Sequence, residues 1–81
     1  MVTINGIIEI DLHGRNQYQA KVMINAKLAR ADGAYRIRII HGFNSGNTLK
    51  NMIFAEYSLH PKVLRLVSIN TGVTDLVLKE L

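Results

Sequence analysis

The residues best suited to chemistry begin with the segment Asp11-Leu12-His13-Gly14. Side chains two positions apart on a β-strand project from the same face, so we expect Asp11 and His13 to lie together while Leu12 faces the core. A carboxylate beside an imidazole fixes the tautomer of the ring and stabilises its protonated form, which suits general acid–base catalysis near neutral pH. A polar strand end, with the histidine bonded to a turn carbonyl, explains the same spacing without chemistry.

A second candidate is the segment HGFNSGN, residues 41–47, between a predicted strand and a predicted helix. Glycines let backbone N–H groups approach an anion closely, and a helix that starts nearby adds a favourable dipole for phosphate. The segment is not a Walker A loop, because Asn47 stands where that motif has lysine. An ordinary strand–helix connection, whose glycines serve the turn geometry, is the alternative interpretation.

Hydrophobic patterning predicts the elements that position these two segments. The patterns predict a helix over about 17–31, with Asn16 as its N-cap, and another over about 48–59. They predict strands over 6–12, 35–40, 63–68 and 74–79. Strands joined by helices of this length lie parallel through right-handed crossovers, whereas the short connection near 70–72 predicts an antiparallel final pair. We therefore expect an α/β fold: a two-layer βαβαββ sandwich with a mixed, mostly parallel four-stranded sheet and both helices on one face.

The open face of this sheet is expected to carry the polar alternates of the strands. These are Glu9, Asp11, Arg36, Arg38, Asp75 and Lys79. Arg36 and Arg38 are candidates for contacts along a phosphate backbone, although a solvated sheet face is the commoner explanation of such arginines. Phe43 is a candidate for stacking on a base, but a core role is commoner for aromatics, and Tyr18 is interpreted as a core or helix-packing residue.

Topology predicts that the two candidate segments meet. If the first βαβ unit has the usual handedness, its two strands are neighbours, and their carboxyl ends bring both segments to the edge where open α/β sheets bind ligands. Arg15 and Lys50 follow just beyond, in the loop or first helical turn of each unit. Two histidines, an aspartate, glycine amides and two cations would together form a phosphodiester site.

The composition bounds the fold and excludes several classes of protein. The 81 residues carry ten Lys/Arg against six Asp/Glu, a formal charge of +4, with no cysteine. That length allows a single domain, 1–81, with a core from about residue 7 onward. There is no disulfide framework, zinc ribbon or thiol nucleophile, and the histidines lack the spacing of a metal site. No apolar run approaches the ~18 residues of a membrane span, so we expect a cytoplasmic protein whose charge favours nucleic acid as partner.

Three segments resemble the motifs of one known family. IDLHG at residues 10–14, followed by a helix with Gln19-Ala20, resembles the LDLHG opening of the Smr (small MutS-related) domain. RIIHG at residues 38–42, with Gly46 and Leu49-Lys50, resembles the second motif of that family, roughly I-I-H-G-x-G-x-G-x-L-R/K. The segment 59–63, LHPKV, and Gly72 before a terminal strand also resemble its usual ending. The resemblance covers about residues 7–81.

This resemblance implies a two-layer βαβαββ fold and nucleic-acid binding, often with RNA-cleaving or DNA-nicking endonuclease activity. In the family the D-x-H pair, here Asp11 and His13, is associated with cleavage. The histidine and glycines of the second motif, here His41, Gly42 and Gly46, are associated with substrate binding or activity. Asn44 stands where the family usually has glycine. Because asparagine also adopts left-handed conformations, the turn is expected to survive the change.

We therefore expect a monomeric endonuclease in which His13, oriented by Asp11, is base or acid and His41 is the complementary proton-transfer or binding group. The candidates for phosphate binding are Gly14, Arg15, Arg36, Arg38, Gly42, Asn44, Gly46 and Lys50. RNA cleavage through the 2′-hydroxyl needs no metal, whereas DNA nicking would use an activated water with Mg²⁺ or Mn²⁺. The alternatives are a non-catalytic module that binds structured or ribosome-associated RNA or DNA, and a protein–protein adaptor.

Overall fold

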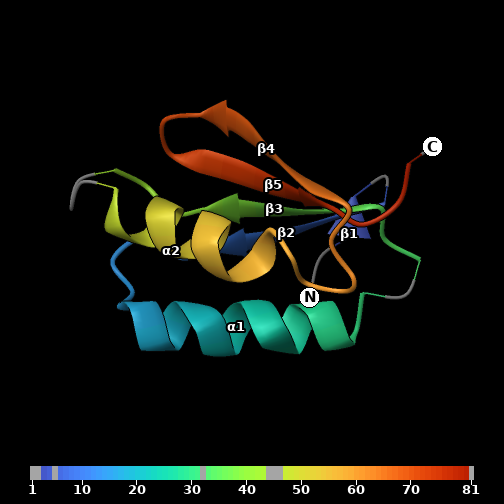
Figure 1. Ribbon diagram of the computed structural model, residues 1–81, viewed down its shortest axis with the longest axis horizontal. Helices are drawn as coiled ribbons and strands as arrows, with labels where there is room; N and C mark the ends of the chain where they lie inside the picture. Colours follow the sequence, from blue (N-terminus) through green and yellow to red (C-terminus); the bar gives the residue numbers. More distant parts are fainter. Residues whose placement is uncertain (1–2, 5, 32, 44–46, 81) are drawn as a thin grey trace.

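The computed structural model describes residues 3–4, 6–31, 33–43 and 47–80. It shows a mixed five-stranded sheet with two helices packed on one face (Figure 1). The strands are β1 (Thr3–Ile4), β2 (Ile7–Asp11), β3 (Arg36–Ile40), β4 (Arg65–Asn70) and β5 (Val73–Val77), and they lie in the order β1-β2-β3-β5-β4. The helices are α1 (Gln17–Ala29) and α2 (Thr48–Tyr57). Among the described residues, no helix is long and apolar enough to cross a membrane.

The core forms where the alternating apolar side chains of the central strands meet the helices. β2 and β3 pair in parallel, with Ile8 opposite Ile37 and Ile10 opposite Ile39, and all four side chains are buried. Leu12, one residue past β2, continues the same face and is fully buried. The helices contribute the buried residues Ala20, Ile24, Leu28, Met52, Ile53 and Tyr57. The two-layer arrangement with both helices on one face is confirmed.

The predicted mixed sheet is confirmed, with β2, β3, β4 and β5 as its four main strands, but fewer of its neighbouring strands pair in parallel than expected. Among the strands that the structure describes, β2–β3 is the parallel pair, and the β1–β2, β3–β5 and β4–β5 pairs are antiparallel. β4 runs in the same direction as β2 and β3, but β5 lies between β3 and β4. β5 is buried along most of its length, whereas β4 is largely exposed and suits an edge. The two-residue β1 is too short to produce a periodic signal and was not predicted.

The start of α1 follows from its capping residues. The Oδ1 of Asn16 accepts a hydrogen bond from the Gln19 backbone N–H at 2.8 Å, and the Gln19 Oε1 accepts one from the Asn16 N–H at 3.1 Å. This reciprocal pair satisfies two donors that a helix start leaves unpaired, which confirms Asn16 as the predicted N-cap. The N-terminal end of α1 is thereby fixed at the edge of the sheet where β2 and β3 end (Figure 1).

A buried carboxylate organises the open face of the sheet. Asp75 is fully buried, and it accepts hydrogen bonds at 2.9 Å from Arg36 Nη1 and from Arg38 Nε and Nη2. Burial by itself would raise the pKa of Asp75, but the hydrogen bonds from the two arginines outweigh it and hold that pKa below its ordinary value of 3.8. The expected cluster of polar residues on this face is confirmed for these three. Lys79 follows the end of β5 and is not on a strand.

Replacing Asp75 with asparagine is expected to lower the free energy of unfolding by about 2–4 kcal/mol, because it keeps the shape of the side chain but leaves two guanidinium groups without their counter-charge. The pKa of Asp75 is lowered on folding, so its contribution is complete above the unfolded pKa and is lost as pH falls below about 4. Urea unfolding of the wild type at about pH 7 and about pH 3, and of the variant at about pH 7, measures both effects.

The matched control is Glu80→Gln. Glu80 accepts hydrogen bonds from Arg65 at 2.7 and 3.4 Å, but both side chains are more than half exposed, so solvent screens the pair and its loss should change stability little. Equal losses of stability in the two variants would contradict the special role of the buried carboxylate.

Candidate functional site

The turn that follows β2 carries the first group of candidate residues. The Leu12 N–H donates to the Ile40 carbonyl at 2.8 Å, which extends the pairing of β2 and β3 by one residue. The Arg15 N–H then donates to the Leu12 carbonyl at 3.0 Å, and Gly14 takes a positive φ of 78° that glycine adopts without strain. The buried Leu12 thus anchors a tight turn that directs His13 to the surface.

Asp11 and His13 form a hydrogen-bonded pair on the surface side of this turn. The Asp11 Oδ1 accepts from the His13 ring Nδ1 and, at 3.2 Å, from the His13 backbone N–H. Their side chains are 55% and 73% exposed, so both reach solvent, as the strand spacing predicts. The two hydrogen bonds from His13 hold the pKa of Asp11 below its ordinary value of 3.8. Because Nδ1 donates to the carboxylate, Nε2 is the nitrogen that can exchange a proton with a bound molecule.

His41, at the end of β3, is enclosed in the fold. It is 4% exposed, its Nδ1–H donates to the Gly42 carbonyl at 2.8 Å, and its Nε2 accepts at 2.9 Å from the Thr74 hydroxyl of β5. The backbone N–H groups of His41 and Gly42 both donate to the Gly72 carbonyl at 3.0 Å. Both ring nitrogens and both amides are therefore engaged inside the protein, so this geometry suits a positioning role for His41 rather than proton transfer.

Gly42 is the point where the two motifs meet. Its φ is +71°, and a Cβ built on it would lie 3.4 Å from the His13 Cβ and 4.0 Å from the His13 Cα. Gly72, in the turn between β4 and β5, also lies close to Gly42, since a Cβ there would lie 3.5 Å from the Gly42 Cα. Three turns thus converge at one edge of the sheet. The predicted meeting of the two candidate segments is confirmed.

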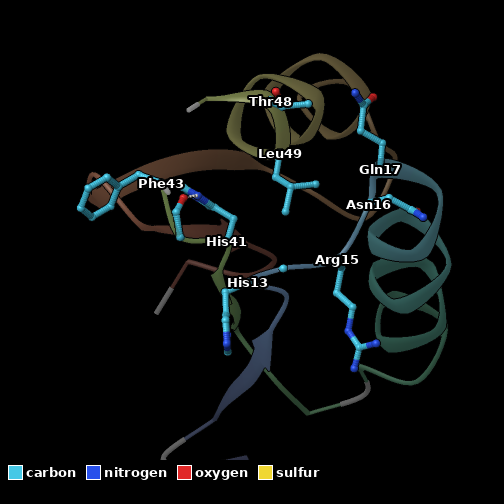
Figure 2. A pocket seen from close by; sticks show the side chains of 10 residues that line it. His13, Arg15, Asn16, Gln17, His41, Phe43, Thr48 and Leu49 are labelled. Carbon is cyan, nitrogen blue, oxygen red and sulfur yellow. Dashed lines mark hydrogen bonds between the residues drawn. The ribbon is translucent and has the colours of Figure 1, made fainter. Parts of the chain in front are cut away.

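A cavity of about 380 Å³ opens at this edge (Figure 2). It is lined by the turn after β2, the end of β3 and the starts of both helices. The lining residues are His13, Gly14, Arg15, Asn16, Gln17, His41, Gly42, Phe43, Thr48 and Leu49. Figure 2 shows the side chains of His13 and Arg15 extending to the same side of the turn, while the Phe43 ring stands at the outer margin. A basic group and an imidazole therefore share this cavity.

The structure brings some of the predicted phosphate-binding residues together and separates others. Gly14, Arg15 and Gly42 line the cavity, and Lys50 lies in the first turn of α2, half-buried and outside the lining. Arg36 and Arg38 are on the open sheet face, where Asp75 binds them. The predicted roles of Asn44 and Gly46 concern residues outside the part of the chain that the structure describes. Within the part of the chain that the structure describes, no three His, Cys, Asp or Glu side chains gather where they could hold a metal ion.

Several cavity residues were missed by the sequence reasoning. Asn16, Gln17, Thr48 and Leu49 line it because both helices begin at this edge, a consequence of the βαβ topology that could have been drawn from the predicted helix starts. Phe43 is 60% exposed, and Tyr18 in α1 is 77% exposed rather than packed in the core. In the sequence, apolar residues cover most of the circumference of α1. Periodicity therefore did not show that Tyr18 is on the side of the helix that faces solvent.

The comparisons with known proteins agree with this architecture. No protein-family model and no curated protein sequence matches the chain. Among solved structures, the chain is similar to the crystal structure of the Smr domain of MutS2 from Thermus thermophilus, with a TM-score of 0.79 and 25% sequence identity. The alignment covers 90% of this chain and 99% of that one.

The chain is an Smr-like domain. The family resemblance stated from the IDLHG and RIIHG motifs is thereby confirmed, and so is the small α/β fold that it implied. In this Smr-like domain the two motifs are not separate features of the sequence. They are the two turns that pack together through Gly42 and His13.

The variants Gly42→Ala and Gly14→Ala separate backbone strain from contact with His13. Alanine at either position is strained by about 1 kcal/mol, because both glycines have positive φ. At position 42 the new methyl group would already be in van der Waals contact with the His13 Cβ at 3.4 Å, so relaxation of the strained backbone has no spare room toward His13, whereas at position 14 the methyl group meets nothing within 4 Å. We expect the larger loss of stability for Gly42→Ala, together with a rise in the pKa of Asp11 toward 3.8 as His13 shifts. Urea unfolding and an NMR titration of the Asp11 carboxyl measure the two effects.

The prediction is wrong if Gly42→Ala and Gly14→Ala lose the same stability and both leave the pKa of Asp11 unchanged. That result would mean that the approach of Gly42 to His13 does not fix the hydrogen-bonded pair.

Proposed function

We propose that this Smr-like domain binds nucleic acid and cleaves its phosphodiester bonds as an endonuclease. The observation that carries the proposal is the exposed Asp11–His13 pair beside a cavity that also contains the cation Arg15. A histidine oriented by a carboxylate is a general base or acid near neutral pH, and an arginine next to it suits the charge of a phosphodiester.

The pair supports RNA as substrate most directly, because a ribose carries its own nucleophile. The Nε2 of His13 takes the proton from the 2′-hydroxyl, and O2′ then attacks the neighbouring phosphorus. The bond between phosphorus and O5′ breaks, and O5′ takes a proton from water. The products are a 2′,3′-cyclic phosphate and a 5′-hydroxyl. Asp11 stabilises the imidazolium that forms during the first step.

The scissile phosphate has two sources of positive charge in this proposal. Arg15 supplies a guanidinium in the cavity lining. The second is the start of α2, where Thr48 and Leu49 line the cavity and the N-cap Asn47 makes no side-chain hydrogen bond to the helix. The first-turn N–H groups of an uncapped helix favour an anion, whereas the capping box of α1 already occupies its own donors. Lys50 adds charge at the same helix start.

His41 acts as a positioning residue in this proposal. Its ring joins β3 to Thr74 of β5, and its neighbour Gly42 meets His13. Loss of the His41 ring would leave the Thr74 hydroxyl buried without its partner and loosen the edge on which the Asp11–His13 pair rests. DNA nicking would instead require an activated water, and Mg²⁺ or Mn²⁺ would supply it.

A second candidate function is a nucleic-acid-binding module that does not cleave. The observation that favours it is the enclosure of His41, which leaves His13 as the one histidine of the two motifs with an exposed ring. Cleavage needs a base and a source of protons for the leaving oxygen, so a single acid–base side chain supports slower chemistry than a matched pair. Such a module would act on structured or ribosome-associated RNA. For both functions we propose a cytoplasmic monomer.

The variant His13→Ala is expected to lower the rate of RNA cleavage by roughly 10²–10⁴-fold, because it removes the general base. Asp11→Asn should also slow cleavage, since a neutral amide does not stabilise the imidazolium. The measurement uses purified proteins with end-labelled structured RNA in EDTA, and with supercoiled DNA in Mg²⁺ or Mn²⁺. The control His60→Gln changes a histidine outside the cavity lining and should keep the wild-type rate.

Each outcome selects one function. Cleavage of RNA in EDTA that His13→Ala abolishes supports the 2′-hydroxyl mechanism, and nicking that requires the metal supports the DNA reaction. Salt-dependent binding with no cleavage by the wild type favours the binding module. Neither binding nor cleavage would favour a protein–protein adaptor, and full cleavage by His13→Ala would overturn the catalytic assignment.

A further inference from the structure

We infer that Phe43 stacks on an unpaired base next to the scissile phosphate, so that the strand cut at this site is unpaired at the point of cleavage. The inference rests on the proposed function and deepens it, because it names the substrate class and a specificity-determining residue. Three features of Phe43 carry it: its exposure, its connection to His13, and its support by a neighbouring turn.

Phe43 exposes a large flat ring beside the cavity that contains the polar groups of the site. It is 60% exposed, although it lines the same cavity as His13 and Arg15. An isolated exposed apolar residue is ordinary on a protein surface. A phenyl ring that shares a cavity with a cation and a general base is more specific, because a nucleotide presents the complementary pair of an anionic phosphate and an apolar base face.

The backbone ties the ring closely to the reacting groups. Gly42, the residue before Phe43, packs on His13, and a Cβ at position 42 would lie 3.4 Å from the His13 Cβ. Consecutive Cα atoms are about 3.8 Å apart, so the Cα of Phe43 is within roughly 9 Å of that of His13. A phosphate held at His13 therefore has its neighbouring nucleotide, rather than a distant one, within reach of the phenyl ring.

A third turn lies next to the ring. Phe43 Cδ1 would lie 3.7 Å from a Cβ placed on Gly72, in the turn between β4 and β5, and the Gly72 carbonyl accepts the N–H groups of His41 and Gly42. The ring is thus attached to the same hydrogen-bonded edge as the motif residues. A supported aromatic ring loses little conformational entropy when a base stacks on it.

The substrate class follows from what such a ring can contact. In a duplex both faces of a base are covered by its neighbours, and only its edges reach the grooves. A phenyl ring can therefore meet a base face only where the base is unpaired or turned out of its stack. The inference predicts a loop, bulge or single strand at the point of cleavage, and little discrimination among the four bases.

The test measures the binding of short fluorescent RNAs to proteins that carry His13→Ala, so that affinity is separated from cleavage. Removal of the ring by Phe43→Ala should weaken the binding of unpaired RNA by roughly 5- to 150-fold and change duplex binding little. Phe43→Trp should keep the affinity, whereas Phe43→Leu, which is apolar but offers no stacking face, should lose it. Tyr18→Ala is the control, because Tyr18 is an exposed aromatic outside the cavity lining.

A scan with abasic nucleotides locates the stacked base. One abasic position should weaken binding to the Phe43 protein by about the same factor as Phe43→Ala, and it should cost the Phe43→Ala protein nothing further. Equal affinities of the alanine, leucine and phenylalanine proteins would overturn the inference. If the His13→Ala protein carrying Phe43 bound neither RNA nor DNA, the proposed function itself would fail.

Discussion

The close approach of Gly42 to His13 is the contact on which the candidate site depends. The parallel pairing of β2 and β3 continues past the strands, through the hydrogen bond from the Leu12 N–H to the Ile40 carbonyl, and this brings the two following turns together. A Cβ at position 42 would already contact the His13 Cβ at 3.4 Å, and the positive φ there disfavours residues other than glycine. The position of the His13 imidazole therefore depends on the backbones of both turns, the one after β2 and the one after β3.

The two motif histidines differ in how the fold holds them. His13 keeps an exposed ring whose orientation comes from Asp11, while His41 uses both nitrogens to join its own turn to Thr74 of β5. A buried imidazole without partners would be costly, whereas one with two hydrogen bonds is a specific connection between strands. The β4–β5 turn then closes the arrangement through the Gly72 carbonyl. Residues distant in sequence thus fix one edge of the sheet.

The sequence was sufficient for those features that local rules determine. The alternation of Ile8 and Ile10 with Glu9, the capping residue Asn16 and the right-handed crossover together predict the two layers and the meeting of the motifs. The errors in strand pairing and in the availability of the two arginines share one cause, which is the position of β5. Local patterns do not show which strand a hairpin adds to the sheet, and this choice places Thr74 against His41. The same choice places Asp75 against the arginines that were expected to be available for phosphate.

The same ion pairs determine where the basic charge of the domain is available. Arg36 and Arg38 face Asp75, with Glu9 beside Arg38 in the register, and Arg65 faces Glu80. Because these positive and negative charges balance, the net charge of +4 comes from the remaining residues, among them Arg15 and Lys50 at the two helix starts. A polyanion is attracted by unbalanced charge, which lies toward the helices and the turns that begin them. The electrostatic field of the domain therefore favours approach to the side that carries the helices over approach to the open sheet face.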